Sequence, residues 1–282
     1  MRIEGYDFTI GADPEIFVKK DGKAVSAYGL VPGTKERPYK VKNGSVQVDG
    51  MALEFNIDPA DNLEGFTANI DAVMKQLKEM TPGYEFLIEP VADFGIDYIA
   101  KQPKEAAELG CNPDFNAYTG KPNPRPDALM PFRTASGHIH IGWTKDVDPL
   151  DPGHFDACVL LTKALDIELG LPALLWEQDL RRKELYGKAG AFRPKSYGME
   201  YRVLSNKFLN YPKLIPYVFR KTEEAIKRAF SYGEKLHTFK ISGKKVDDLI
   251  NNFKGWENTS EEEKHLFDLI YSSVTKTPKA YG

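Results

Sequence analysis

The sequence predicts an α+β protein with a mainly antiparallel sheet. Four stretches alternate polar and apolar residues with a period of two, which is typical of strands that bury one face. Two hairpin signals, Asp21-Gly22 and Asn43-Gly44, favour antiparallel pairing of the strands around them. After residue 204 the apolar spacing becomes helical. Strands followed by helices, rather than a regular alternation of the two, indicate an α+β fold.

The strand with the clearest pattern covers residues 135–143, Ala-Ser-Gly-His-Ile-His-Ile-Gly-Trp. Side chains two residues apart in a strand lie on the same side of the sheet. His138 and His140 therefore face one space, while Ile139 and Ile141 face the other. The pattern predicts a strand with one apolar face and one face that carries two imidazoles.

Three further strands repeat this design. Each places two polar side chains opposite an apolar face: Asp13 and Glu15 in residues 10–18, Glu54 and Asn56 in residues 50–57, and Glu200 and Arg202 in residues 198–203. If the four strands share a sheet, their carboxylates crowd a partly dry site and repel one another unless they protonate or hold cations. Magnesium and manganese accept oxygen ligands and an occasional imidazole. The sequence therefore favours a site for two divalent ions.

Local signals predict the elements in the first half of the chain. Residues 7–18 form a strand, in which Pro14 requires an edge position or a bulge. Asp61 or Asn62 caps a helix that ends near Met80, before a Thr-Pro-Gly stop. The other segments are a return strand at 23–27, a loop at 28–38, strands at 39–42, 45–48 and 84–90, and an irregular segment at 91–134 that is typical of a functional loop or lid.

The second half of the chain is mainly helical. Asp151 opens a helix that runs to about Gly170, and Ser260 with Glu263 fits a capping box. The other elements are a short helix at 172–180, a strand at 198–204, and helices at 212–233, 244–253 and 260–273. Without a repeat or a linker, residues 1–282 are expected to form a single domain, with 212–282 as a helical C-terminal portion.

Composition argues against several classes of protein. The net charge of −3 provides no general basic field for nucleic acid. Two cysteines, Cys111 and Cys158, are too few for a disulfide framework, so we expect both to be small buried groups. The N-terminus has no apolar run like that of a signal peptide, and no segment reaches about 18 uninterrupted apolar residues. We therefore expect a cytoplasmic protein without a membrane span.

A basic stretch at 181–197 precedes the last polar strand. Against a single acid it carries Arg181, Arg182, Lys183, Lys188, Arg193 and Lys195. Gly187 and Gly190 allow the stretch to bend around a ligand. Arginine and lysine side chains in such a loop suit a polyphosphate. Together with the acidic face and a divalent metal, the stretch describes a nucleoside triphosphate site that has neither a P-loop nor a Rossmann motif.

The motifs, taken in order, resemble a known superfamily. Asp-x-Glu, Glu-x-Asn and Gly-His-x-His are followed by Arg-Arg, by Tyr186-Gly187-Lys188-Ala189-Gly190 and by Tyr-Gly-x-Glu-x-Arg. Over about residues 8–210 this series resembles the glutamine synthetase and glutamate–cysteine ligase superfamily. Within it, the series is most similar to the phage-type carboxylate–amine ligases, the type 2 COOH–NH2 ligase family.

The resemblance implies a fold and a reaction. The fold is an α+β, glutamine synthetase-like catalytic domain, in which a curved, mainly antiparallel sheet encloses ATP and two or more Mg²⁺ or Mn²⁺ ions and carries helices on its outer face. The reaction is ATP-dependent phosphorylation of a carboxylate, followed by attack of an amine to give an amide or peptide-like bond. The implied partners are small-molecule or peptide carboxylates and amines, and the resemblance suggests a bacteriophage protein in the host cytoplasm.

The resemblance also implies roles for individual residues. Asp13, His138 and Glu200 would hold one metal, and Glu15 with Glu54 would hold the other. The expected nucleotide-binding residues are His140, Arg182, Tyr186, Lys188, Arg193 and Arg202. The expected catalytic residues are Arg202, which would stabilise the γ-phosphate or acyl phosphate, Glu54 and Arg193.

The chain departs from the glutamine synthetase pattern at the metal ligands. Asp13 stands where a glutamate is usual, and Asp49 and Asp58 are both candidates for a third acid beside Glu15 and Glu54. The ring assembly of glutamine synthetases is not implied, and the oligomeric state stays open. Two alternatives also stay open: an amide hydrolase or phosphotransferase that uses the same site, and a non-enzymatic binding or assembly protein stabilised by metal.

Overall fold

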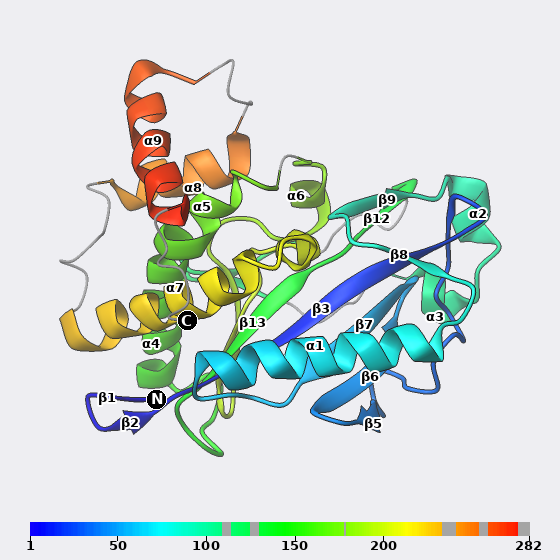
Figure 1. Cartoon of the computed structure of the whole chain (residues 1–282). Coiled ribbons are helices and arrows are strands. Elements are labelled where there is room, and N and C mark those ends of the chain that lie inside the picture. The colour runs from blue at the N-terminus through cyan, green and yellow to red at the C-terminus, as the bar shows by residue number, and fades with distance from the viewer. Residues whose placement is uncertain (109–113, 125–129, 178, 233–240, 254–258, 276–282) are drawn as a thin grey trace.

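The structure is a computed structural model that describes residues 1–108, 114–124, 130–177, 179–232, 241–253 and 259–275 (Figure 1). It confirms the predicted α+β class. The strands are β1 (Arg2–Ile3), β2 (Tyr6–Asp7), β3 (Thr9–Lys20), β4 (Lys23–Val25), β5 (Tyr39–Val41), β6 (Gly44–Asp49), β7 (Ala52–Ile57), β8 (Glu85–Leu87), β9 (Val91–Asp93), β10 (Phe115–Asn116), β11 (Lys121–Pro122), β12 (Phe132–Thr134), β13 (Gly137–Gly142), β14 (Ala191–Lys195) and β15 (Gly198–Tyr201).

The helices stand in four groups along the chain, after β7, β9, β13 and β15. The α-helices are α1 (Leu63–Met80), α2 (Ile96–Ala100), α3 (Lys104–Ala107), α4 (Pro152–Leu165), α5 (Leu171–Ala173), α6 (Arg182–Leu185), α7 (Leu214–Lys227), α8 (Gly243–Asn252) and α9 (Glu261–Thr275). The other helical turns are the π-helices η1 (Asp166–Gly170) and η3 (Arg228–Tyr232) and the 3₁₀-helix η2 (Asn206–Asn210).

One large sheet organises the molecule. Among the described residues it has eleven strands, with the order β11-β10-β14-β15-β13-β3-β7-β6-β5 and with β4 and β8 both paired to β3. Every strand pair in it is antiparallel. The sheet is open at both ends, and β3 crosses its centre (Figure 1). The mainly antiparallel sheet that the sequence predicts is thus confirmed.

The four polar strands are neighbours in this sheet. In sheet order they are β15, β13, β3 and β7, so their polar faces join into one surface. The register sets His140 opposite Glu200 and His138 opposite Asp13. On the far side of β3, Glu15 lies opposite Glu54. Because directly opposed residues share a face, residues more than 180 positions apart in the chain meet there.

Pro14 lies in a central strand, and a bulge accommodates it. Ile10 pairs with Ala60 and Glu15 pairs with Glu54, so the segment from Glu54 to Ala60 contains one residue more than the β3 segment that it faces. That mismatch is a β-bulge in the 54–60 segment, and Pro14 lies in the part of β3 opposite it. At a bulge some backbone positions form no hydrogen bond between the strands, so a proline, which has no backbone N–H, is tolerated there. This is the second of the two predicted ways to place Pro14.

The opposite face of the sheet is the hydrophobic core. Helix α1 begins at its N-cap Asn62, whose side chain accepts from the backbone N–H of Gly65, and it buries one apolar side against the sheet. The core joins the inward strand residues with apolar side chains of the helices, among them Phe66, Leu161 and Phe219. Figure 1 shows α1 along one half of the sheet, with α4, α5 and α7–α9 gathered at the other. The helices therefore leave the polar face free for a site.

Four predicted segments differ from the structure. The segment 91–134 is not wholly irregular, since its described residues include the antiparallel pair β9–β12 and the short helices α2 and α3. The predicted helix at 172–180 is wrong, because α5 ends at Ala173. The predicted helix at 151–170 changes to the π-helix η1 at Asp166. The basic stretch 181–197 is also less of a loop than its glycines indicated, because it contains α6 and β14.

Several local predictions are confirmed. Ser260 and Glu263 form the reciprocal capping box, each side chain accepting from the other's backbone N–H. Cys158 is buried, whereas Cys111 lies outside the described residues. None of the helices in the described part of the chain combines the length and apolar content needed to cross a bilayer. The single-domain organisation stays a prediction.

Candidate active site

A cavity of about 440 Å³ lies on the polar face of the sheet. Its walls come from the four polar strands, from β6 and β14, and from the segments before β7 and β13. Among the predicted site residues, those that line it are Asp13, Glu15, Glu54, His138, His140, Tyr186, Arg193, Glu200 and Arg202. Asp49 also lines it, and Asp58 does not.

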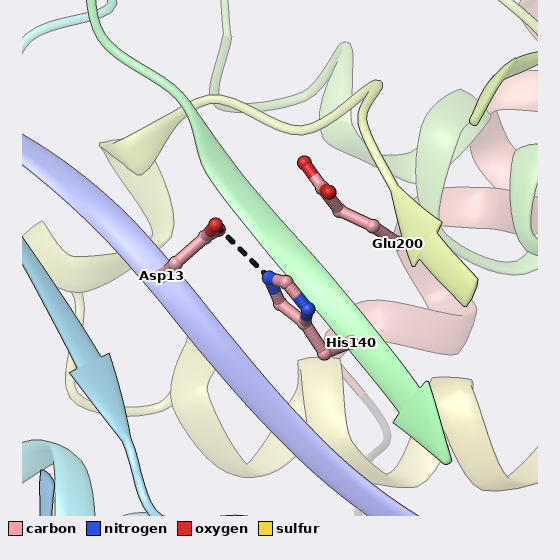
Figure 2. Close-up of side chains that lie close together, drawn as sticks. All are labelled: Asp13, His140 and Glu200. Carbon is pink, nitrogen blue, oxygen red and sulfur yellow. Dashed lines mark ion pairs between the residues drawn. The ribbon is translucent and has the colours of Figure 1, made fainter. Parts of the chain in front are cut away.

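Asp13 lies between the two imidazoles of β13. Its Oδ1 lies 3.2 Å from His138 Nδ1, and its Oδ2 lies 2.9 Å from His140 Nε2. Figure 2 shows Asp13 facing His140 across the β3–β13 pair, with Glu200 directed at the same space from β15. Asp13, His140 and Glu200 can each offer a ligand atom within 4.8 Å of the others. His140 therefore lies at least as close to the Asp13 carboxylate as His138, which was the imidazole predicted to bind metal.

The pKa values of the two imidazoles shift in opposite directions. Burial and the nearby Arg202 guanidinium lower the pKa of His138 to about 4, so this ring is neutral at pH 7. Burial opposes protonation of His140 too, but the charge of Asp13 outweighs it and raises its pKa. Burial likewise raises the pKa of Asp13, and the two imidazoles more than reverse that effect. Asp13 is therefore ionised throughout the physiological range.

Glu200 is the most enclosed carboxylate of the site, with 1% of its surface exposed. Three cations surround it: Arg193 Nη1 at 3.2 Å, Lys195 Nζ at 3.1 Å, and Arg202, whose Nη1 contacts Oε1. Arg202 is also bound through Nε to Asp114 Oδ2 at 3.2 Å. Burial alone would raise the pKa of Glu200, but Arg202 and its neighbours hold it well below its usual range. The result is a cationic wall with one fixed carboxylate.

Glu15 and Glu54 form the acidic wall on the other side of Asp13. Glu15 Oε2 accepts from the Ser136 N–H at 2.7 Å, and Glu54 Oε2 accepts from Gln47 Nε2 at 2.8 Å. Burial, with repulsion from Asp49, raises the pKa of Glu15 to about 7. Burial and the charge of Asp13 also raise the pKa of Glu54. Both carboxyls therefore bind a proton more readily in the folded protein than in the unfolded chain, chiefly because they are buried.

Removing the Glu15 charge is expected to stabilise the metal-free protein at high pH. A carboxyl whose pKa is raised by folding contributes stability below its unfolded pKa, near 4.5, and loses it as pH rises through about 7. The unfolding free energy of Glu15→Gln minus that of the wild type should therefore increase by about 2 kcal/mol from pH 5 to pH 8. Urea unfolding in EDTA measures this difference, in which the titration of His138 is common to both proteins. An equal difference at both pH values would contradict the charge assignment.

Two of the predicted nucleotide-binding cations do not face the cavity. Arg182 has 1% of its surface exposed, and its guanidinium donates to the carbonyls of Val203 and Leu204 and to Ser136 Oγ. It thus ties α6 to the chain that follows β15. Lys188 lines neither this cavity nor the neighbouring one. The cations of the basic stretch that do line the cavity are Arg193 and Lys195, both on β14.

The absence of a side chain at Gly187 leaves space for the Arg182 guanidinium. Gly187 has a φ of +73°, and a Cβ there would lie 1.8 Å from Arg182 Nη1, which the surrounding carbonyls hold in place. Gly83 has a similar φ of +81° but open space around it. Gly187→Ala should therefore cost about 3 kcal/mol of stability, against about 1 kcal/mol for Gly83→Ala. Thermal unfolding compares the two, and equal losses would show that only backbone strain matters.

Four contributors to the site were not predicted. Gln47 lies between Val46 and Val48, so its alternation was a usable signal. Tyr197 donates or accepts at His140 Nδ1 over 2.5 Å. Lys195 belonged to the basic stretch but was not singled out. Asp114 lies far from every motif, and nothing in the sequence connects it with Arg202.

A second cavity, of about 730 Å³, adjoins the first. The two share His140, Asn56 and Tyr197 as lining residues. The residues that line the second cavity include Tyr6, Gly142 and Trp143. It therefore extends the polar site into a space with aromatic walls.

Comparison with protein families identifies the class of the chain as a carboxylate–amine ligase. The family model described as phage phiEco32-like COOH·NH2 ligase type 2 matches residues 130–278. This match covers more than half of the chain, so the chain belongs to the phage phiEco32-like COOH·NH2 ligase type 2 family. The matched range contains His138, His140 and Glu200. A comparison with curated proteins finds no match.

Proposed function

We propose that the chain is an ATP-dependent ligase that activates a carboxylate as an acyl phosphate and transfers it to an amine. The observation that carries the proposal is the division of one cavity into two walls. Glu200 with Arg193, Lys195 and Arg202 forms the cationic wall, and Glu15 with Glu54 forms the acidic wall. A triphosphate with its divalent ions has the complementary charge pattern.

The residues present fit a divalent cation. His138 Nε2 is buried and has no hydrogen-bond partner in the described part of the chain. Asp13, Glu200 and an imidazole supply the oxygen and nitrogen ligands that magnesium and manganese accept. Glu15 and Glu54, whose pKa values are raised, would hold a second ion. When bound, such ions neutralise charge on phosphate oxygens.

The proposed reaction has two balanced steps. A carboxylate oxygen of the acid attacks the γ-phosphorus of ATP, and the bond to the β-phosphate oxygen breaks, giving an acyl phosphate and ADP. The amine nitrogen then attacks the acyl carbon, phosphate leaves with the C–O bonding pair, and the nitrogen loses a proton. Arg202 and Arg193 are positioned to stabilise the transferring phosphoryl group, because both line the cavity beside Glu200.

The nucleotide is proposed to enter from the Tyr197 side. Lys195 and Tyr197 line the cavity there, and His140 lies where the two cavities meet. The aromatic walls of the second cavity suit a flat base, and the cationic wall of the first suits its phosphates. Because ATP is an intracellular substrate, we infer a cytoplasmic site of action, in the host if the chain is encoded by a phage.

A product assay tests the proposal. The protein is incubated with Mg²⁺, ATP and panels of acids and amines, and ADP, phosphate and amide are measured together. Equal amounts of all three are expected. ADP without amide would indicate a phosphotransferase, and amide cleavage without ATP would indicate a hydrolase. Calorimetry that shows no nucleotide binding would instead favour a non-enzymatic binding protein.

A further inference from the structure

Lys35 holds an ammonium group against the acidic wall of the cavity. Its Nζ lies 2.8 Å from Asp49 Oδ2, and both side chains line the cavity together with Glu15 and Glu54. The cations of the opposite wall contact Glu200 instead. Lys35 has no role in the mechanism above. It is a positive charge that the chain itself supplies where a second divalent ion is proposed to bind.

The charges of this wall are close enough to act on one another. Glu15 lies opposite Glu54 in the register, and repulsion from Asp49 adds to burial in raising the pKa of both. Burial opposes the charge of Lys35, but attraction to Asp49 and to the two glutamates outweighs it and raises the pKa of the ammonium. Lys35 is therefore charged at neutral pH and interacts with the same three carboxyl groups that an ion at this wall would contact.

The backbone around Lys35 is fixed, whereas its side chain can move. The Val48 N–H donates to the Gly33 carbonyl at 3.1 Å, which ties the segment to β6. Thr34 and Arg37 exchange two backbone hydrogen bonds, each 3.1 Å long, which close a turn around residue 35. The side chain itself is 46% exposed and has a flexible four-carbon stem. The ammonium can thus leave the wall for solvent while the backbone stays in place.

A divalent ion and the Lys35 ammonium would compete for this wall. A partly exposed ion pair such as that of Lys35 with Asp49 is weak, because water screens it. Magnesium and manganese carry twice the charge and prefer carboxylate oxygens as ligands. Two cations on one small group of carboxylates repel each other, most strongly where burial limits screening. Binding of the ion therefore favours departure of the ammonium, which has an open path to solvent.

We propose that Lys35 is a tethered counter-cation, which neutralises the acidic wall through Asp49 until a second divalent ion binds and displaces it. The inference rests on the proposed function, which places an ion beside Glu15 and Glu54. Lys35 then sets the concentration of divalent cation at which this wall is filled. It acts on metal binding through Asp49 and takes no part in phosphoryl transfer.

Calorimetry with Mn²⁺ alone tests the competition. Lys35→Gln keeps a polar side chain but removes the ammonium, so Mn²⁺ should bind the acidic wall about tenfold more tightly than in the wild type. High salt should reduce the difference, because it screens the ammonium. Lys40→Gln is the matched control, because Lys40 is an exposed lysine on β5 that is not among the residues lining the cavity. It changes the net charge equally and should bind Mn²⁺ as the wild type does.

Acetylation of the lysines provides an independent measurement in the wild type. Acetic anhydride reacts with neutral amines, so pairing with Asp49 protects Lys35. Addition of Mn²⁺ should raise the rate of Lys35 acetylation, relative to that of Lys40, by about threefold or more, as measured by peptide mass spectrometry. This measurement uses no variant, so it decides the question even if Lys35→Gln does not fold.

Two results would overturn the inference: a Lys35→Gln protein whose Mn²⁺ affinities match those of Lys40→Gln, or a Lys35 acetylation rate that Mn²⁺ leaves unchanged. Adding Glu54→Gln to Lys35→Gln should abolish the tightened site, and its persistence would count against the proposal. Neither measurement uses ATP or a substrate. A protein that makes amide but fails these tests would therefore keep the ligase function and lose only the role of Lys35.

Discussion

Glu200→Gln is expected to lower turnover about 10³-fold while leaving the fold intact. The amide keeps the shape of the side chain but removes the charge that faces Arg193, Lys195 and Arg202. Three cations would then repel one another around a site that also loses a proposed metal ligand. Affinity for Mn²⁺ should fall together with turnover, because both depend on the same carboxylate.

The assay compares ADP release and Mn²⁺ titration for Glu200→Gln and for Glu184→Gln. Glu184 is an exposed acid on α6 in the same stretch of chain, so its variant controls for the change in net charge. A Glu200→Gln protein with turnover and Mn²⁺ affinity near those of the control would contradict the assigned role. Circular dichroism at the assay temperature confirms that both variants are folded.

Arg202→Lys is expected to reduce kcat by about 10²-fold or more, with a much smaller change in KM for ATP. Lysine keeps a positive charge, so the electrostatic pairing with Glu200 partly survives. It cannot contact Glu200 and Asp114 simultaneously through different edges of a planar group, as Arg202 does. An arginine fixed by two carboxylates is therefore expected to act mainly on the transferring phosphoryl group.

Steady-state kinetics separates this role from simple ATP binding. If Arg202 only attracts the nucleotide, its replacement by lysine should raise KM and leave kcat unchanged. That pattern would contradict the proposed role. Arg181→Lys is the matched control, because Arg181 also bridges two carboxylates, Asp93 and Asp179, but does so on the exposed surface.

Much of the fold could be predicted because the polar alternation was strong. His138 and His140 in β13, and Glu200 in β15, lie in strands whose opposite faces are buried, so a shift of one residue would exchange their sides. The hairpin at Asp21-Gly22 and the cap at Asn62 follow from local turn and helix chemistry, and both occur. Local rules thus sufficed wherever one face of an element had to be apolar.

Which side chains of the basic stretch face the cavity could not be predicted. Arg182 and Arg193 could not be told apart by sequence in a glycine-containing stretch. In the structure Arg182 donates to backbone carbonyls and does not line the cavity, whereas Arg193 contacts Glu200 within it. The difference arises because α6 and β14 form around Gly187, which sequence spacing does not reveal. The contact of Asp114 with Arg202 likewise depends on the tertiary placement of a segment without a motif. Long-range packing decided these cases.

The central place of β3 has a consequence during protein synthesis. β3 can pair with β4, β7 and β8 early, but its residues 9–14 meet β13 only later in synthesis. At ribosomal elongation rates, the residues between Asp13 and Glu200 take about 10 to 40 s to emerge. Throughout most of that interval the nascent chain presents an unpaired edge that carries ionisable groups, which disfavours adhesion to neighbouring chains. The charges that serve the mature site thus also protect the growing polypeptide until its last partners arrive.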